Sequence, residues 1–196
     1  MRVISGSKKG LKLKAPKGLS TRPTTDRIKE SLFNILSPVL RECRFLDMFA
    51  GSGGIGIEAL SRGASEVFFI DRDREALEVI KDNIQKADFS RQAVVLGFDW
   101  KTALKHIENR GLKFDVIFMD PPYNSDFIEN ILDEIKNLGI LNNEGIVVVE
   151  QAKDEPEIIK EGFKVYRVKD YGKTTKISFL TLEETENVKS GLPGEL

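Results

Sequence analysis

The sequence predicts an α/β protein with a doubly wound, mostly parallel sheet of seven strands. Short apolar runs alternate with segments whose apolar residues recur at helical spacing along most of the 196-residue chain. The run at 146–149 is apolar without interruption, which is typical of a strand buried on both faces of a parallel sheet. Strand–helix–strand units of this kind cross over with one hand and build a doubly wound sheet.

The N-terminal half should start with a small β-hairpin and a helix. Apolar pairs at Val3–Ile4 and Leu11–Leu13 flank a turn rich in glycine and lysine, which indicates the hairpin. Apolar residues at helical spacing predict a helix over 25–36, and Pro38 should end it. Apolar runs then predict strands at 45–46, 67–70 and 94–96, with helices at 57–60 and 74–87 between them.

The C-terminal half should complete the sheet and end in an antiparallel hairpin. A helix around His106 has an apolar face that leaves this histidine at the surface. The remaining expected elements are strands at 116–119 and 146–149, helices at 127–138 and 157–159, and paired strands at 163–168 and 176–182. We therefore expect a basic hairpin and helix at 1–40, a main domain at 41–182 and a frayed acidic tail at 183–196.

Cysteine and histidine content limits the chemistry. A single cysteine, Cys43, excludes an internal disulfide and favours a reducing cytoplasm. With only one histidine besides, no metal site built by the protein is expected, and Cys43 is interpreted as a packing residue. No apolar run is long enough for a membrane span and the first residues lack a signal-peptide core, so we expect a cytoplasmic protein with no membrane partner.

The first 29 residues are strongly basic. They contain nine lysines and arginines against one acid, Asp26, although the whole chain has a net charge of −1. A basic segment on an acidic body favours a polyanionic partner such as RNA, and a solvated lysine-rich terminus is the alternative. The residues expected to contact RNA are Arg2, Lys8, Lys9, Arg22 and Arg27.

A glycine motif follows the expected strand at 45–46. Gly51, Gly53 and Gly56 fit the pattern G-x-G-x-x-G between a strand and a helix, where backbone N–H groups can meet a ligand. Asp71 lies 20 residues beyond Gly51 at the end of the next strand, where an acid can accept hydrogen bonds from ribose hydroxyls. The combination indicates a Rossmann-like nucleotide site, and it does not separate NAD from S-adenosylmethionine.

The tetrapeptide Asp120-Pro-Pro-Tyr123 follows the expected strand at 116–119. Its carboxylate and carbonyl oxygens accept hydrogen bonds, its prolines lack N–H groups, and Tyr123 can stack on a flat ring. These properties suit an enzyme that modifies the exocyclic amine of a nucleobase. A strand followed by a simple proline turn is the alternative. If the first and fourth strands flank the point where the winding reverses, Gly51 and Asp120 share one cleft.

These motifs together resemble the RsmD family of class I S-adenosylmethionine-dependent methyltransferases. The resemblance extends to Leu182, and it rests on residues 2–13, Arg22-Pro-Thr24, Arg27, residues 30–36, 46–53 and 58–64, and Asp120 to Tyr123. It implies S-adenosylmethionine as cofactor and methylation of the N2 amine of a guanine in 16S ribosomal RNA. An assembled or part-assembled 30S particle is the expected partner, and the protein is expected to be a monomer.

The resemblance also implies roles for individual residues. Asp47 and the turn of Phe49, Ala50, Gly51, Ser52 and Gly53 would hold the methionine part of the cofactor. Asp71 would bind the ribose, and Asp99 the adenine amine, with Phe98 or Trp100 packed nearby; a helix N-cap is the alternative for both acids. Asp120 and the Pro121 carbonyl would accept from the target amine, with Pro122 and Tyr123 completing the loop.

Three other functions stay open at the level of sequence. A dehydrogenase would share the glycine turn, but the remaining chain is short for a separate substrate domain. A non-catalytic RNA-binding module would explain the basic segment and leave Asp120 to Tyr123 without a purpose. A methyltransferase acting on the N6 amine of DNA adenine, or on another nucleic-acid or protein amide target, would keep the mechanism and change the substrate.

Overall fold

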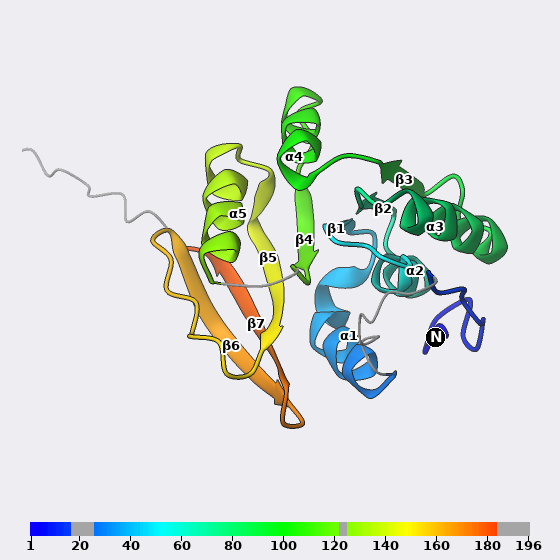
Figure 1. Ribbon diagram of the computed structural model, residues 1–196, viewed down its shortest axis with the longest axis horizontal. Coiled ribbons are helices and arrows are strands. Elements are labelled where there is room, and N and C mark those ends of the chain that lie inside the picture. The colour runs from blue at the N-terminus through cyan, green and yellow to red at the C-terminus, as the bar shows by residue number, and fades with distance from the viewer. Residues whose placement is uncertain (17–25, 122–124, 184–196) are drawn as a thin grey trace, which may run out of the picture.

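A computed structural model describes residues 1–16, 26–121 and 125–183. Seven strands form one sheet in the order β3-β2-β1-β4-β5-β7-β6 (Figure 1). The first five are parallel, and β7 and β6 add an antiparallel hairpin. The predicted Rossmann-like α/β fold is therefore confirmed. The strands are β1 (Arg44–Asp47), β2 (Glu66–Ile70), β3 (Ala93–Leu96), β4 (Phe114–Met119), β5 (Leu141–Ala152), β6 (Phe163–Tyr171) and β7 (Thr175–Leu182).

Five helices cover the two faces of the sheet. They are α1 (Asp26–Leu40), α2 (Gly54–Ser61), α3 (Arg74–Ala87), α4 (Trp100–Asn109) and α5 (Ser125–Asn137). The apolar residues of α1, α2 and α3 share one buried cluster, and those of α4 and α5 share the other, on the opposite face. None of the helices in the described ranges is long and apolar enough to cross a bilayer.

Strand β1 lies next to β4, although β2 and β3 intervene in the chain. Phe45 pairs with Val116 and Asp47 with Phe118, and the N–H of Met48 donates to the Phe118 carbonyl at 3.0 Å. The winding of the sheet reverses between these two strands, which opens a crevice at their carboxyl ends. The sequence-based expectation for this switch point is confirmed.

Four local expectations have different outcomes. Cys43 is buried, and burial raises the pKa of its thiol to about 12, while His106 is exposed; both were predicted. The expected end of the first helix is wrong, because α1 continues through Pro38 to the buried Leu40. Packing of that last turn outweighs the hydrogen bond that proline removes. The helix expected at 157–159 is also absent from the structure described there.

The N-terminal hairpin packs directly on α2. Its two arms are joined by hydrogen bonds between Val3 and Leu11 at 2.9 Å and between Gly10 and Val3 at 2.9 Å, with one bridge from Arg2 to Lys12. Gly6 has a φ of +83°, and a Cβ there would lie 1.8 Å from the carbonyl oxygen of Ser61. Glycine is required at this position because the hairpin touches the helix backbone.

A buried carboxylate, that of Glu58 on α2, joins the hairpin to two helices. It accepts from the N–H groups of Ile4 at 2.7 Å and Ser5 at 3.0 Å. Arg62 donates to it at 2.8 Å, and the Lys29 ammonium of α1 lies 3.5 Å away. Glu58 and Lys29 are both almost wholly inaccessible, so Glu58 supplies a counter-charge that offsets the burial of the Lys29 ammonium.

We predict that Glu58→Ala lowers the unfolding free energy by about 3–5 kcal/mol, because it leaves the Lys29 ammonium buried without its counter-charge. Urea denaturation measures the change. Glu66→Ala is the matched control, because Glu66 forms a partly exposed pair with Arg44 at 2.9 Å and its loss should cost less than about 1 kcal/mol. Equal losses for the two variants would refute the structural role of Glu58.

Candidate active site

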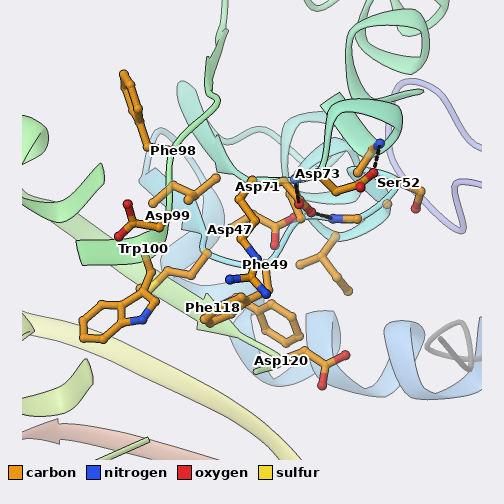
Figure 2. A pocket seen from close by; sticks show the side chains of 18 of the residues that line it. Asp47, Phe49, Ser52, Asp71, Asp73, Phe98, Asp99, Trp100, Phe118 and Asp120 are labelled. Atoms are coloured by element: carbon orange, nitrogen blue, oxygen red, sulfur yellow. Dashed lines mark hydrogen bonds between the residues drawn. The ribbon is translucent and has the colours of Figure 1, made fainter. Parts of the chain in front are cut away.

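A cavity of about 480 Å³ opens at the carboxyl ends of β1, β2 and β4. Figure 2 shows Asp47, Phe49 and Asp71 in its middle, Asp120 beside Phe118 at one end, and Phe98 at the far edge. Gly51 and Asp120 both line this cavity, as the predicted strand order requires. The described lining residues expected from sequence are Asp47, Phe49, Ala50, Gly51, Ser52, Asp71, Phe98, Asp99 and Asp120.

The glycine turn is held by two carboxylates. Gly51 has a φ of +54°, and its N–H donates to Asp71 Oδ2 at 2.8 Å. Gly53, with a φ of +74°, is the N-cap residue directly before α2. Asp47 accepts from the Gly56 N–H at 3.0 Å and is otherwise buried at the cavity wall. Burial raises the pKa of Asp47 to about 7; the negative charges of Asp71 and Asp120 add to the rise, and the Gly56 N–H opposes it.

Asp71 and Asp99 differ in the roles of their carboxylates. Asp71 is not the cap of α3, since Asp73 is the N-cap and accepts from Ala76 N at 2.8 Å. Each Asp71 oxygen accepts one backbone N–H, a carboxylate oxygen can accept a second hydrogen bond, and Asp71 lines the cavity. Asp99 is the N-cap of α4, and the Thr102 hydroxyl, at 2.6 Å, is the main cause of its lowered pKa.

Aromatic rings form another wall of the cavity. Phe127 of α5 lies 5.9 Å from Phe49 and 5.7 Å edge-on from Trp100, measured between ring centroids. Phe98 is 41% exposed and its ring lies beside His106. Of the two aromatic residues expected near Asp99, Trp100 therefore belongs to the aromatic cluster and Phe98 to the rim. Sequence reasoning missed Phe127, because its helical spacing indicated only a core residue.

The acceptor residue Asp120 directly follows β4. Water reaches its carboxylate, yet the walls of the cavity desolvate it enough to raise its pKa to about 6. Pro121 is half-buried, whereas Pro122 and Tyr123 lie outside the described residues. Asp120 therefore places a carboxylate at the end of a crevice that also contains aromatic rings.

The basic segment is less free than its charge suggested. Lys29, one of the nine basic residues, is buried, and Arg2 pairs with Asp26 at 2.8 Å. Lys14 pairs with Asp82 at 2.7 Å. Lys9 and Arg27 are exposed, Lys8 lies over the Phe89 ring at 5.5 Å, and Arg22 falls outside the described ranges. Fewer than nine of these positive charges are therefore available to a polyanion.

The N-terminal hairpin reaches the cavity itself. Met1 and Lys29 line it, and the Ser52 hydroxyl donates to the Met1 sulfur at 3.3 Å. The amide of Asn83 on α3 bonds both the Lys14 backbone and the Ser52 carbonyl, at 2.8 to 3.0 Å. Residues upstream of β1 therefore contribute to the cavity wall, because the hairpin packs on the glycine turn. No sequence signal singled out Met1, Lys29 or Asn83.

Residues 1–180 match the protein family described as Conserved hypothetical protein 95. The chain belongs to this family, the RsmD family. Ribosomal RNA small subunit methyltransferase D of Haemophilus influenzae is 36% identical over 88% of this chain and 89% of its own length. YlbH of Bacillus subtilis is 43% identical over 89% of this chain and 95% of YlbH. The resemblance inferred from sequence is confirmed.

Solved structures agree with membership of the RsmD family. The yhhF protein of Escherichia coli superposes with a TM-score of 0.81 at 32% identity, covering 94% of this chain and 99% of its own. SMU.776, solved in complex with SAH, has a TM-score of 0.66 at 12% identity, over 79% of this chain and 49% of that one. The second likeness concerns the fold alone.

We predict that Asp47→Asn stabilises the ligand-free protein at pH 8 by at least ~1 kcal/mol. An acid with a raised native pKa binds a proton that the unfolded chain lacks between pH 4 and 7, so its stability contribution falls as pH rises through that window. In the variant, the unfolding free energy should decrease less between pH 5 and pH 8 than in the wild type. Urea denaturation at pH 5 and pH 8 measures it, with Asp82→Asn at the surface as control. An unchanged pH dependence of the unfolding free energy would show that burial does not raise the pKa of Asp47.

Proposed function

We propose that this chain transfers a methyl group from S-adenosylmethionine to the N2 amine of a guanine in 16S ribosomal RNA. As a member of the RsmD family it is an S-adenosylmethionine-dependent rRNA methyltransferase. The observation that supports an exocyclic amine as the target is Asp120, a hydrogen-bond acceptor that lines the same cavity as the glycine turn and Asp71. An exocyclic amine needs such an acceptor, and uracil has no such amine.

The residues of the cavity fit S-adenosylmethionine. Asp47 is a buried carboxylate with a raised pKa, and a cationic amino group is the partner that would offset its burial. Asp71 presents oxygens suited to ribose hydroxyls, and Phe49, Phe127 and Trp100 supply flat apolar surface. When bound, the cofactor supplies an electrophilic methyl group on a sulfonium.

The protein's task is to orient a weak nucleophile. The lone pair of the guanine amine is delocalised into the ring, so the amine must be held in line with the methyl group. Asp120 and the Pro121 carbonyl would accept its two N–H bonds and localise the lone pair. The nitrogen becomes positive as the methyl transfers, so an ionised Asp120 stabilises the transition state more than the ground state. The cation then loses its proton without a strong base.

The target base must leave its stack to reach Asp120, at a cost of a few kcal/mol. A ring beside the acceptor loop, proposed to be that of Tyr123, would offset about 1–3 kcal/mol of this cost by stacking. The exposed cations of the N-terminal region, including Lys9 and Arg27, would hold the phosphates around the target. The 30S particle is the proposed form of the substrate.

Identification of the product tests the proposal. Incubation with labelled S-adenosylmethionine and 30S particles, naked 16S ribosomal RNA or DNA, followed by digestion and nucleoside mass spectrometry, should yield N2-methylguanosine from 16S ribosomal RNA, with 30S particles preferred. N6-methyladenosine in DNA would instead support the alternative substrate class. Absence of any nucleoside methylation would refute the proposed substrate and leave the fold and family assignment in place.

We predict that Asp120→Asn lowers single-turnover methylation by at least about 100-fold, because a neutral amide is a weaker acceptor and can be oriented with its donor inward. In the wild type the rate should rise with pH through about 6 and then level off, since the ionised carboxylate is the active form. The variant should lose that rise. Asp133→Asn, whose carboxylate pairs with Lys160 on the surface, is the matched control. A wild-type rate in Asp120→Asn would refute the role.

A further inference from the structure

The charges along the cavity wall are unequally distributed. Its described lining contains five carboxylates and two cationic side chains, those of Lys29 and Arg72. The carboxylates belong to Asp47, Asp71, Asp73, Asp99 and Asp120. An anionic group on a ligand would be repelled from most of this wall, so only the surroundings of the two cations can receive it. Arg72 follows the ribose-side acid and is exposed, whereas Lys29 is buried.

Lys29 lies at the end of the cavity formed by the glycine turn. Its ammonium donates to the Arg2 carbonyl at 2.6 Å, and the neighbouring Met1 packs against Ser52 through the 3.3 Å contact. Gly54, the first residue of α2, lines the same end, where unpaired N–H groups of the helix favour negative charge. Lys29 is thus a buried cation near the part of the cavity lined by Met1, Ser52 and Gly54.

The positive charge of Lys29 is incompletely neutralised. Its counter-ion, Glu58, lies 3.5 Å away and also binds Arg62 at 2.8 Å, so one carboxylate faces two cations. Glu58 further accepts two backbone N–H groups. An ammonium has three donors, and among the described residues Lys29 uses them toward the Arg2 carbonyl and Glu58 only. Within the described part of the chain, one donor therefore remains for a ligand, and the group of Lys29, Arg62 and Glu58 carries a net positive charge.

We infer that Lys29 binds the α-carboxylate of the amino-acid part of S-adenosylmethionine, opposite the Asp47 carboxylate that receives the α-ammonium. This rests on the proposed function, because it takes the methyl donor as the ligand of the cavity. The two charged groups of an amino acid then meet two buried groups of opposite charge, one from β1 and one from α1. Because Lys29 also holds the Arg2 carbonyl, the cofactor's carboxylate contacts the residue that anchors the basic hairpin.

The competing explanation is that Lys29 has only a structural role. A comparison of the affinities for two ligands distinguishes this role from binding of the carboxylate. Decarboxylated S-adenosylmethionine keeps the adenosine, sulfonium and ammonium and lacks only the carboxylate. Calorimetry without RNA should show the wild type binding it about ten- to 100-fold more weakly than S-adenosylmethionine. In Lys29→Gln, which keeps a donor for the Arg2 carbonyl, the two affinities should agree to within about threefold.

A structural role predicts a different result: Lys29→Gln would weaken both ligands by the same factor and preserve their ratio, which would overturn the inference. Lys86→Met is the matched control. Lys86 also holds the hairpin through a lysine-to-carbonyl bond, to Lys12 at 2.6 Å, but does not belong to the described cavity lining. It should retain the wild-type ratio.

The affinities of the wild type for the two ligands provide a second test, which a folding defect in a variant cannot affect. Equal affinity of the wild type for the two ligands would overturn the inference even if S-adenosylmethionine binds well, and the proposed function would stand. No binding of S-adenosylmethionine to the wild type would instead contradict the proposed function itself. Preference for the carboxylate in the wild type, lost in Lys29→Gln and kept in Lys86→Met, supports Lys29 as its binding residue.

Discussion

The buried carboxylate of Glu58 is the interaction on which the arrangement of the site depends. It satisfies two backbone N–H groups of the hairpin and lies between Lys29 and Arg62, so four partners offset its desolvation. Helix α2, which carries Glu58, begins directly after the glycine turn. Glu58 therefore links the hairpin, α1 and α2, and Asn83 adds a link between the hairpin and the glycine turn, so a shift in one alters the cavity wall formed by the others.

The described lining of the cavity has an excess of negatively charged side chains, which a cationic ligand would offset. Asp47 and Asp120 both have pKa values raised by desolvation, to about 7 and about 6. Such carboxylates destabilise the ligand-free protein above those pH values, and a cationic ligand reverses the effect. In the proposed function, the cost of burying these two carboxylates would be offset by a cationic group of the cofactor at Asp47 and by the amine that becomes positive at Asp120.

The sheet and the central acids could be predicted because their signals are local. A strand, the glycine turn and Asp71 lie within residues 45–71, and Asp120 follows an apolar run. Lys29 could not be predicted, because composition counts a lysine as surface charge and only the packing of α1 against α2 buries it. Phe127 shared its spacing with core residues of α5, and α1 passes Pro38 because Leu40 is held by tertiary contacts.

The docking of the hairpin has a consequence for how the protein is assembled. Residues 1–14 are synthesised before their partners Glu58, Ser61 and Asn83, which follow 53 to 69 positions later. The hairpin must stay undocked until α2 and α3 have emerged, which makes its closure a late, high-separation step. During that interval its lysines are without their final neighbours, and a nascent chain would expose a basic terminus that the folded enzyme partly conceals.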